Sequence, residues 1–426
     1  MRGKRLALAM MVAWAGSATI ALPLQAQTAP AETLRIDAKR IDAALAAMVA
    51  DGRAAGTSAL IWQDGREVYF GTAGMADRAA QRPMRRDTIA QIYSMTKPVT
   101  GVALMQLWEQ GKFRLDDPLA KYLPEYAAMR VDAGRDAAGR PRTVPAERPI
   151  SVRDILRHTA GFAYGAGPTP AHDAYVAADP LALDIPLAEA SKRLAGVPLL
   201  YQPGTQWEYS IAVDVQAALV EKLSGQPFAD YVRTHIFGPL GMTETAWRQP
   251  DARLPRLAAM NVKKDGKLVQ QPAAEAQTLN FKDHALTPGG FGLASTLDDY
   301  SRFARMLLNK GELDGARILR PSTVELMATD QLDPAITARA WLPSKGAVGF
   351  GFDFAVRKSP PQTAEENRGA VGEFFWDGMA STLFWVDPAN KLTAVFFVQT
   401  IPYDGTLHRD FRAAVYGPDY RGPPGD

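Results

Sequence analysis

Residues 91–107 read QIYSMTKPVTGVALMQL, and the rest of the chain is organised around this stretch. From Val99 onward almost no position is polar, which predicts a central helix packed on all sides. Pro98 fits the first turn of that helix, where a missing backbone N–H costs nothing. Ser94 and Lys97 are separated by about one helical turn, so their side chains would share one face of the helix. The stretch therefore predicts a nucleophile with a base beside it at the head of a buried helix.

Ser94 and Lys97 can form a catalytic pair only in a suitable environment. A serine hydroxyl is unreactive at neutral pH unless another group removes its proton, and a lysine does so only when burial or a nearby cation keeps it partly neutral. The apolar helix would supply that burial. A Ser-x-x-Lys tetrad nevertheless arises by chance about once in a chain of this length. Its position at the head of an apolar helix, rather than the tetrad itself, makes the two residues catalytic candidates.

The composition of the 426-residue chain is that of a globular protein with nearly balanced charge. The formal net charge is +2 and the basic residues are dispersed, which argues against binding to nucleic acid or to an anionic membrane surface. The chain has no cysteine, so disulfides and thiol chemistry are excluded. Its five histidines lack metal-ligand spacing. We therefore expect a small, neutral or weakly charged substrate, with neither a cofactor nor a metal.

The first 26 residues differ from the rest of the chain. Three basic residues among the first five precede an apolar run at 6–22, and small residues that suit cleavage follow, ending at Ala26. This pattern predicts a secretory signal peptide over 1–26, a linker over 27–34, and a periplasmic or secreted mature chain. A membrane anchor is the alternative, but a glycine, a serine and a threonine interrupt the apolar run. We expect no stable membrane insertion after cleavage.

The two ends of the mature chain are expected to form one sheet. Asp64-Gly65 stands between strand-like runs at 57–62 and 68–74, which predicts a tight hairpin and an antiparallel start to the sheet. Between the ends the chain is mostly helical, with an exposed loop expected over 131–148. Further strands are expected at 348–355, 373–375, 381–386 and 392–398. Strands at both ends therefore bracket a helical middle.

Several short motifs follow the Ser94 tetrad in a fixed order. They read LRHTAGF at 156–162, YS at 209–210, GGFGL at 289–293 and WDG at 376–378. In this order they resemble the penicillin-recognising serine hydrolases, namely class C β-lactamases, serine D-alanyl-D-alanine peptidases and family VIII carboxylesterases. The resemblance covers nearly all of the mature chain, about 35–416.

The resemblance implies an α/β (α+β) fold of the β-lactamase/transpeptidase type. Such a fold has an antiparallel sheet flanked by helices plus a mainly helical region, with the active site between them. The domain prediction is accordingly one serine hydrolase domain over 35–420. Its sheet region would comprise about 35–92 and 290–420, and its helical region about 93–289.

The resemblance also implies a role for each site residue. Ser94 would attack the acyl carbonyl, while Lys97 and Tyr209 would manage its proton and protonate the leaving group. The backbone N–H groups of Ser94 and Met379 would form the oxyanion hole. Without the motif context, Tyr209 would be interpreted as a core aromatic residue.

Two departures from the family pattern bear on the substrate. The WDG at 376–378 stands where β-lactamases and peptidases carry Lys-Thr-Gly, so the lysine that would meet a substrate carboxylate is missing, and an uncharged indole cannot replace it. The YSI at 209–211 stands where Tyr-x-Asn is usual, which removes the amide for a substrate acylamino group. Both changes resemble the esterases and favour an uncharged acyl chain. Trp376, Asp377 and Gly378 would be the substrate-binding residues.

Three side chains have simpler interpretations. Trp376 could be a core residue at a strand edge, and Asp377 fits a turn better than a binding site. His158 is expected to hydrogen-bond the end of its own short helix rather than to act as a base, because Ser94 already has Lys97 one turn away.

We therefore expect an exported serine hydrolase of carboxylesterase type that cleaves short acyl esters through an acyl-serine intermediate. One alternative is β-lactamase, D-alanyl-D-alanine carboxypeptidase or D-aminopeptidase activity at the same site. Another is a catalytically silent protein that binds cell-wall peptides, although such a protein would have no chemical reason to retain Ser94, Lys97 and Tyr209. The partner is a small ester or β-lactam-like molecule, and the oligomeric state stays open.

Overall fold

The computed structural model describes residues 34–420, so the predicted signal peptide and its cleavage site lie outside the described residues. The described residues belong to one compact unit. None of the helices between residues 34 and 420 is both long and apolar enough to cross a bilayer.

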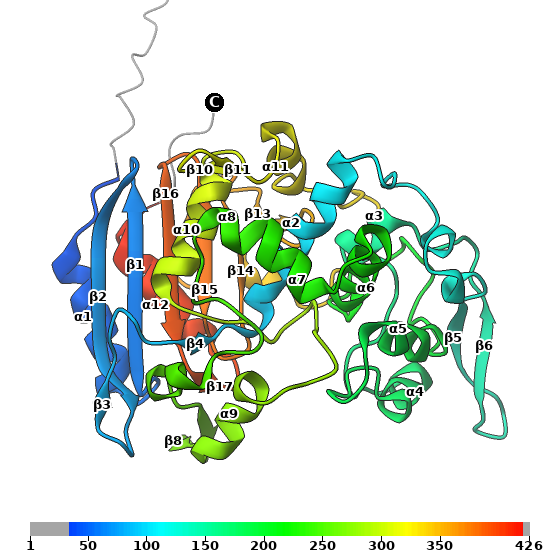
Figure 1. Ribbon diagram of the computed structural model, residues 1–426, viewed down its shortest axis with the longest axis horizontal. Helices are drawn as coiled ribbons and strands as arrows, with labels where there is room; N and C mark the ends of the chain where they lie inside the picture. Colours follow the sequence, from blue (N-terminus) through cyan, green and yellow to red (C-terminus); the bar gives the residue numbers. More distant parts are fainter. Residues whose placement is uncertain (1–33, 421–426) are drawn as a thin grey trace, which may run out of the picture. The chain divides into compact units, whose positions relative to one another are not determined.

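An eight-stranded antiparallel sheet unites the two ends of the described chain (Figure 1). The predicted hairpin joins β1 to β2, and β1 pairs on its other side with β16, where Thr57 faces Val398. The antiparallel sheet built from both ends of the chain is therefore confirmed. Across the sheet the strands are β12 (Val348–Phe350), β13 (Ala355–Arg357), β14 (Phe374–Asp377), β15 (Leu383–Asp387), β16 (Leu392–Val398), β1 (Gly56–Gln63), β2 (Arg66–Asp77) and β3 (Arg82–Pro83).

Helices cover both faces of the sheet. Every residue of β14, β15 and β16 is buried, which a strand achieves only when both of its faces are covered. The helices α1 (Ala38–Ala50) and α12 (Gly405–Tyr416) lie together on one face, and α10 (Leu297–Leu308) lies on the other (Figure 1). The buried residues of α10 recur at helical spacing, so one stripe of this helix packs on the sheet.

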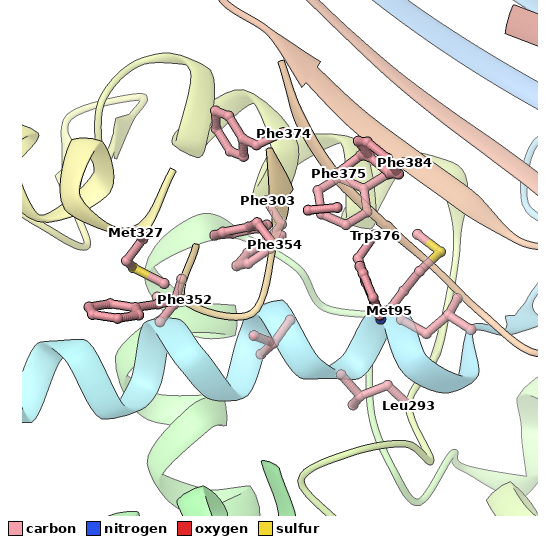
Figure 2. Close-up of a cluster of buried hydrophobic side chains, with 14 of the residues drawn as sticks. Met95, Leu293, Phe303, Met327, Phe352, Phe354, Phe374, Phe375, Trp376 and Phe384 are labelled. Atoms are coloured by element: carbon pink, nitrogen blue, oxygen red, sulfur yellow. The ribbon is translucent and has the colours of Figure 1, made fainter. Parts of the chain in front are cut away.

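The helix α2 (Thr96–Glu109) lies between the sheet and the helical region (Figure 1). All of its residues from Thr96 to Met105 are buried, which confirms the predicted helix packed on all sides. Figure 2 shows the Trp376 side chain pointing from its strand toward the start of α2, beside Met95. The helical region contains α3 (Val152–Leu156), α4 (Pro170–Ala178), α5 (Leu187–Ala195), α6 (Ala212–Ser224) and α7 (Phe228–Val232).

Shorter elements complete the unit. They are β4 (Ala90–Gln91), β7 (Asn261–Lys264), β8 (Lys267–Gln270), α8 (Gly238–Leu240), α9 (Ala273–Phe281), β9 (Ala294–Ser295), β10 (Glu312–Leu313), β11 (Ala316–Arg317), α11 (Pro321–Met327) and β17 (Thr400–Ile401).

Two sequence predictions about secondary structure were wrong. The loop expected over 131–148 is a hairpin of β5 (Arg130–Arg135) and β6 (Pro141–Pro145), closed by a turn in which Asp136 accepts backbone hydrogen bonds. The single strand expected over 348–355 is two strands, β12 and β13. Asp353, at φ 62°, turns the chain back between them, so the two strands pair with each other.

Candidate active site

Ser94 lies in a short 3-10 turn, η1 (Tyr93–Met95), directly before α2. Tyr93 has φ 43°, in the left-handed region that residues other than glycine rarely adopt. The hydroxyl of Tyr300 donates a 2.7 Å hydrogen bond to the carbonyl of Met95 and so fixes the end of this turn. Helix α2 therefore begins two residues after Ser94 rather than at it, and Ser94 stays partly exposed.

Lys97 lies beside Ser94 on the first turn of α2, with its Nζ 3.3 Å from Oγ of Ser94. Only 1% of the residue is exposed. Burial lowers the pKa of Lys97 to about 8, although negative charge on Asp214, Asp353 and Asp377 acts in the opposite direction. Near neutral pH a fraction of the amine is therefore unprotonated and able to accept a proton from Ser94.

The glycine-rich bend at 289–292 holds the amine of Lys97. Nζ donates a 2.8 Å hydrogen bond to the carbonyl of Gly290, whose own N–H donates to Oδ1 of Asp214. A Cβ on Gly290 would lie 2.8 Å from Oδ2 of Asp214 and 3.1 Å from Nζ of Lys97. Only glycine allows this close approach of the bend to Lys97 and Asp214.

Tyr209 joins the pair from the helical region. Its ring centroid lies 4.5 Å from Nζ of Lys97, and the Ser94 side chain interacts with its hydroxyl. Nε1 of Trp376 donates a 3.4 Å hydrogen bond to the same hydroxyl. Burial raises the pKa of Tyr209 well above its usual value, whereas the bonds with Ser94 and Trp376 lower it. The fold therefore brings Ser94, Lys97 and Tyr209 together, with the tyrosine protonated at neutral pH.

His158 supports the Tyr209 segment from the side. Its Nδ1 accepts a 3.2 Å hydrogen bond from the backbone N–H of Ser210, and its ring centroid lies 4.9 Å from that of Tyr209. Burial lowers the pKa of His158 well below its usual value, so the ring is neutral. The sequence placed this histidine at the end of its own helix, but its ring instead contacts the next motif along the chain.

The motif at 376–378 ends β14 and packs against the turn of the nucleophile. A Cβ on Gly378 would lie 2.3 Å from Oγ1 of Thr382 and 2.5 Å from the carbonyl oxygen of Ile92, so glycine is required here. This contact places Met379, the next residue, beside the segment that carries the nucleophile. The Met379 side chain is exposed, and the oxyanion role of its backbone N–H stays a prediction.

The two tryptophans that contact Tyr209 differ in solvent exposure. Trp376 is only 1% exposed, so its indole supports Tyr209 and presents almost no surface to a substrate in this structure. Trp341 is 39% exposed, and its ring centroid lies 5.3 Å from that of Tyr209 and 6.1 Å from that of Trp376. Trp341 belongs to none of the sequence motifs, and it supplies the exposed aromatic surface beside the site.

Asp377 is a strand residue with a charged partner, not the turn residue expected from the sequence. It ends β14 and forms a buried ion pair with Lys345, which closes the short helix η6 (Leu342–Lys345). Nζ of Lys345 also donates a 3.1 Å hydrogen bond to the hydroxyl of Tyr403. The sequence contained no signal for this cation, because 32 positions separate the two partners and no motif includes Lys345.

No group of three or more histidine, cysteine, aspartate or glutamate residues within 34–420 is arranged to hold a metal ion. The site formed by Ser94, Lys97 and Tyr209 can perform nucleophilic attack and proton transfer. Ser94 would be the attacking group, and Lys97 and Tyr209 are the adjacent proton-transfer groups.

The model of the β-lactamase family matches residues 41–416 of the chain. Protein Rv1367c of Mycobacterium tuberculosis is 35% identical over 379 residues, which are 86% of this chain and 90% of that protein. Esterase EstB of Burkholderia gladioli is 29% identical over 406 residues, which are 89% of this chain and 95% of the esterase.

A solved structure agrees with these sequence relatives. EstCE1, described as a hydrolase with promiscuous acyltransferase activity, has a TM-score of 0.70 and 26% identity, and the match covers 89% of this chain and 98% of EstCE1. The antiparallel sheet with flanking helices is therefore the β-lactamase/transpeptidase-like fold that the motifs implied. The chain belongs to the β-lactamase family, as a serine hydrolase related to esterases and acyltransferases.

Proposed function

We propose that the chain is a serine esterase that cleaves short, uncharged acyl esters through an acyl-enzyme on Ser94. The observation that carries the proposal is the placement of Nζ of Lys97 3.3 Å from Oγ of Ser94, with a lysine pKa lowered to about 8. A neutral amine at this distance is a competent general base for a serine hydroxyl.

In the acylation step, Oγ of Ser94 attacks the carbonyl carbon of the ester while Nζ of Lys97 takes the hydroxyl proton. The negative charge that develops on the carbonyl oxygen is stabilised by the backbone N–H groups of Ser94 and Met379. The C–O bond to the alcohol then breaks. Tyr209, whose hydroxyl interacts with the Ser94 side chain, passes a proton to the departing alkoxide and recovers one from Lys97.

In the deacylation step, water attacks the acyl-Ser94 carbonyl and loses its proton to the same basic groups. The carboxylic acid leaves and Ser94 regains its proton. No group beyond water and these side chains is required. In the net reaction, one ester and one water give one carboxylic acid and one alcohol.

The experiment compares the mature protein with Ser94→Ala on p-nitrophenyl butyrate. A fluorophosphonate probe, followed by intact-protein mass spectrometry, reports the nucleophile. We expect turnover and one covalent adduct on the parent, and neither on Ser94→Ala. Faster turnover of a β-lactam or of a D-alanyl-D-alanine peptide than of the ester would favour the β-lactamase or peptidase alternative. Folded protein without adduct or turnover would favour the silent binding protein.

Acyl transfer is a second candidate for the same acyl-enzyme. EstCE1, at 26% identity, is described as having promiscuous acyltransferase activity. The exposed side chains of Trp341 and Met379 offer an apolar surface on which an alcohol could replace water. Product analysis with an added alcohol such as butanol would detect the new ester. If no new ester forms at any alcohol concentration, acyl transfer is rejected and the activity is hydrolysis only.

We also propose that the esterase is exported. The basic start, the apolar run at 6–22 and the small residues near Ala26 support a cleaved signal peptide. Expression of the full chain followed by mass determination of the protein in the periplasm or medium tests this, since cleavage near Ala26 would give a mature chain lacking the apolar run. An uncleaved protein retained in the cytoplasm would contradict it.

A further inference from the structure

A buried cation lies beside the proposed acyl site, in a chain that lacks the family's Lys-Thr-Gly lysine. Lys345 is 4% exposed, and its ammonium lies 5.2 Å from the ring centroid of Trp341 and 5.8 Å from that of Trp376. Its hydrogen bonds go to Asp377 and Tyr403. The positive charge thus lies next to the exposed aromatic surface, on a different segment from the motif that would normally provide it.

Asp377 cancels this charge. The Lys345 and Asp377 side chains are 5% and 10% exposed, so water screens them little, and they form an ion pair. His408 also faces the pair, with Nδ1 3.9 Å from the Asp377 carboxylate, but burial lowers the pKa of His408 to about 4, so it is uncharged at neutral pH. The cluster therefore has no net charge.

Asp377 also lies within electrostatic reach of Lys97 and Tyr209. The negative charge of Asp377 raises the pKa of Lys97 and contributes to raising that of Tyr209. A substrate atom next to these two groups would experience the charge of Asp377 in the same way, and one beside Trp341 would lie near the ammonium of Lys345. A charged acyl group held beside these side chains would therefore interact with both members of the pair.

We propose that the Lys345–Asp377 ion pair sets the charge selectivity of the acyl site. With both charges present the site accepts uncharged acyl chains and gains nothing from a carboxylate. Without the Asp377 charge, Lys345 becomes an uncompensated ammonium that attracts an anionic acyl chain. Without the Lys345 charge, Asp377 repels it. The proposal deepens the esterase function and rests on it, since it concerns the substrates of the same site.

The test compares two esters of nearly equal shape and different charge. Ethyl 4-methylpentanoate is neutral. Ethyl hydrogen succinate has the same acyl chain except that a carboxylate replaces the terminal isopropyl group. The readout is the ratio of kcat/KM for the anionic ester to that for the neutral ester, from the rate of ethanol release. A ratio removes effects that act on both substrates alike, such as a change in the pKa of Lys97.

Three variants of the pair give opposed expectations. Asp377→Asn should raise the ratio by about tenfold or more, and Lys345→Met should lower it by a similar factor. The double variant restores neutrality and should return the ratio to within about threefold of the parent value. Higher salt should reduce the gain in Asp377→Asn.

A matched control uses an exposed ion pair on the surface. Asp64 and Lys391 are 49% and 75% exposed at 3.8 Å separation, and Asn suits the positive φ of 50° at position 64. Asp64→Asn and Lys391→Met make the same charge changes there and should leave the ratio unchanged.

Negative results distinguish failure of the charge-selectivity proposal from failure of the esterase function. An unchanged ratio in folded, active Asp377→Asn and Lys345→Met overturns the charge-selectivity proposal alone. If Asp377→Asn does not fold, Lys345→Met tests the proposal alone: a lower kcat/KM ratio supports it, and an unchanged ratio overturns it. No ester turnover by the parent, with no fluorophosphonate adduct, overturns the esterase function and this inference with it.

Discussion

Nζ of Lys97 donates a 2.8 Å hydrogen bond to the backbone carbonyl of Gly290, a residue 193 positions farther along the chain. This bond orients the amine, whose Nζ also lies 3.3 Å from Oγ of Ser94. A neutral amine that donates one hydrogen to Gly290 keeps its lone pair available for the serine proton. The glycine bend therefore does for Lys97 what a bonded carboxylate does for a catalytic histidine: it holds the proposed base in position.

Hydrolysis should depend on pH through Lys97. The amine must be neutral to act as a base, and its pKa is lowered to about 8 by burial. We expect kcat/KM for p-nitrophenyl butyrate to rise about tenfold per pH unit below 8 and to level off above it. Initial rates between pH 5.5 and 9.5 check this. A flat profile across pH 8 would contradict the assignment of Lys97 as the base.

Lys97→Met should lose activity and gain stability at neutral pH. The pKa of Lys97 falls from 10.5 to about 8 on folding, so below pH 8 the fold must bury a charge that the unfolded chain keeps in water. Removing this charge should add about 1–2 kcal/mol to the free energy of unfolding at pH 7, after subtracting the lost bond to Gly290. Turnover should fall at least 10³-fold.

Denaturant unfolding of the parent and Lys97→Met at pH 7 and pH 10.5 tests the sign of this effect. The advantage of the variant should shrink as pH rises from 8 to 10.5, because the parent lysine becomes neutral in both states. An advantage that grows with pH would contradict burial as the cause of the lowered pKa.

Gly378→Ala should lower kcat through a steric clash, without creating a cavity in the core. The added methyl would meet Oγ1 of Thr382 at 2.3 Å and the carbonyl oxygen of Ile92 at 2.5 Å, so the end of β14 must move away from the turn of the nucleophile. We expect a fall in kcat of about 10²-fold, as when one oxyanion donor is lost, with KM changed less. Steady-state kinetics measures both.

Gly196→Ala is the matched control for that variant. Gly196 caps the end of α5 at φ −80°, and a Cβ there would lie an ordinary 3.4 Å from the carbonyl oxygen of Arg193. Its kcat should equal that of the parent. Equal kcat in Gly378→Ala would mean that the close approach at β14 does not position the oxyanion donor.

Trp341→Ala should affect substrate preference more than folding. Trp341 is 39% exposed and packs on Tyr209, so its removal opens the aromatic surface without a large core cavity. For p-nitrophenyl esters from acetate to octanoate, we expect the loss in kcat/KM to grow with acyl length, reaching about tenfold. Val269→Ala, at another exposed apolar position, is the control. A loss equal for all chain lengths would place Trp341 outside the acyl contact.

Local patterns predicted the elements on which the site is built. The apolar run after Pro98 predicted α2 and its burial, and Asp64-Gly65 predicted the hairpin that starts the antiparallel sheet. Both depend on interactions within a few residues, which the sequence states directly. The prediction of a loop over 131–148 was wrong because the alternation there is weak, and the hairpin also depends on a contact with a distant segment, from the N–H of Asp132 to the carbonyl of Leu199.

The sequence by itself determined which candidate reactive groups this protein carries: a Ser-x-x-Lys at the head of an apolar helix, a tyrosine motif, a glycine-rich motif, and a third motif without its lysine. Only the tertiary structure decided the environment of these groups. It buried Trp376 and exposed Trp341, and it set Lys345 against Asp377. Burial and charge pairing depend on contacts between segments far apart in the chain, and no local pattern specifies which distant side chain will fill a given space.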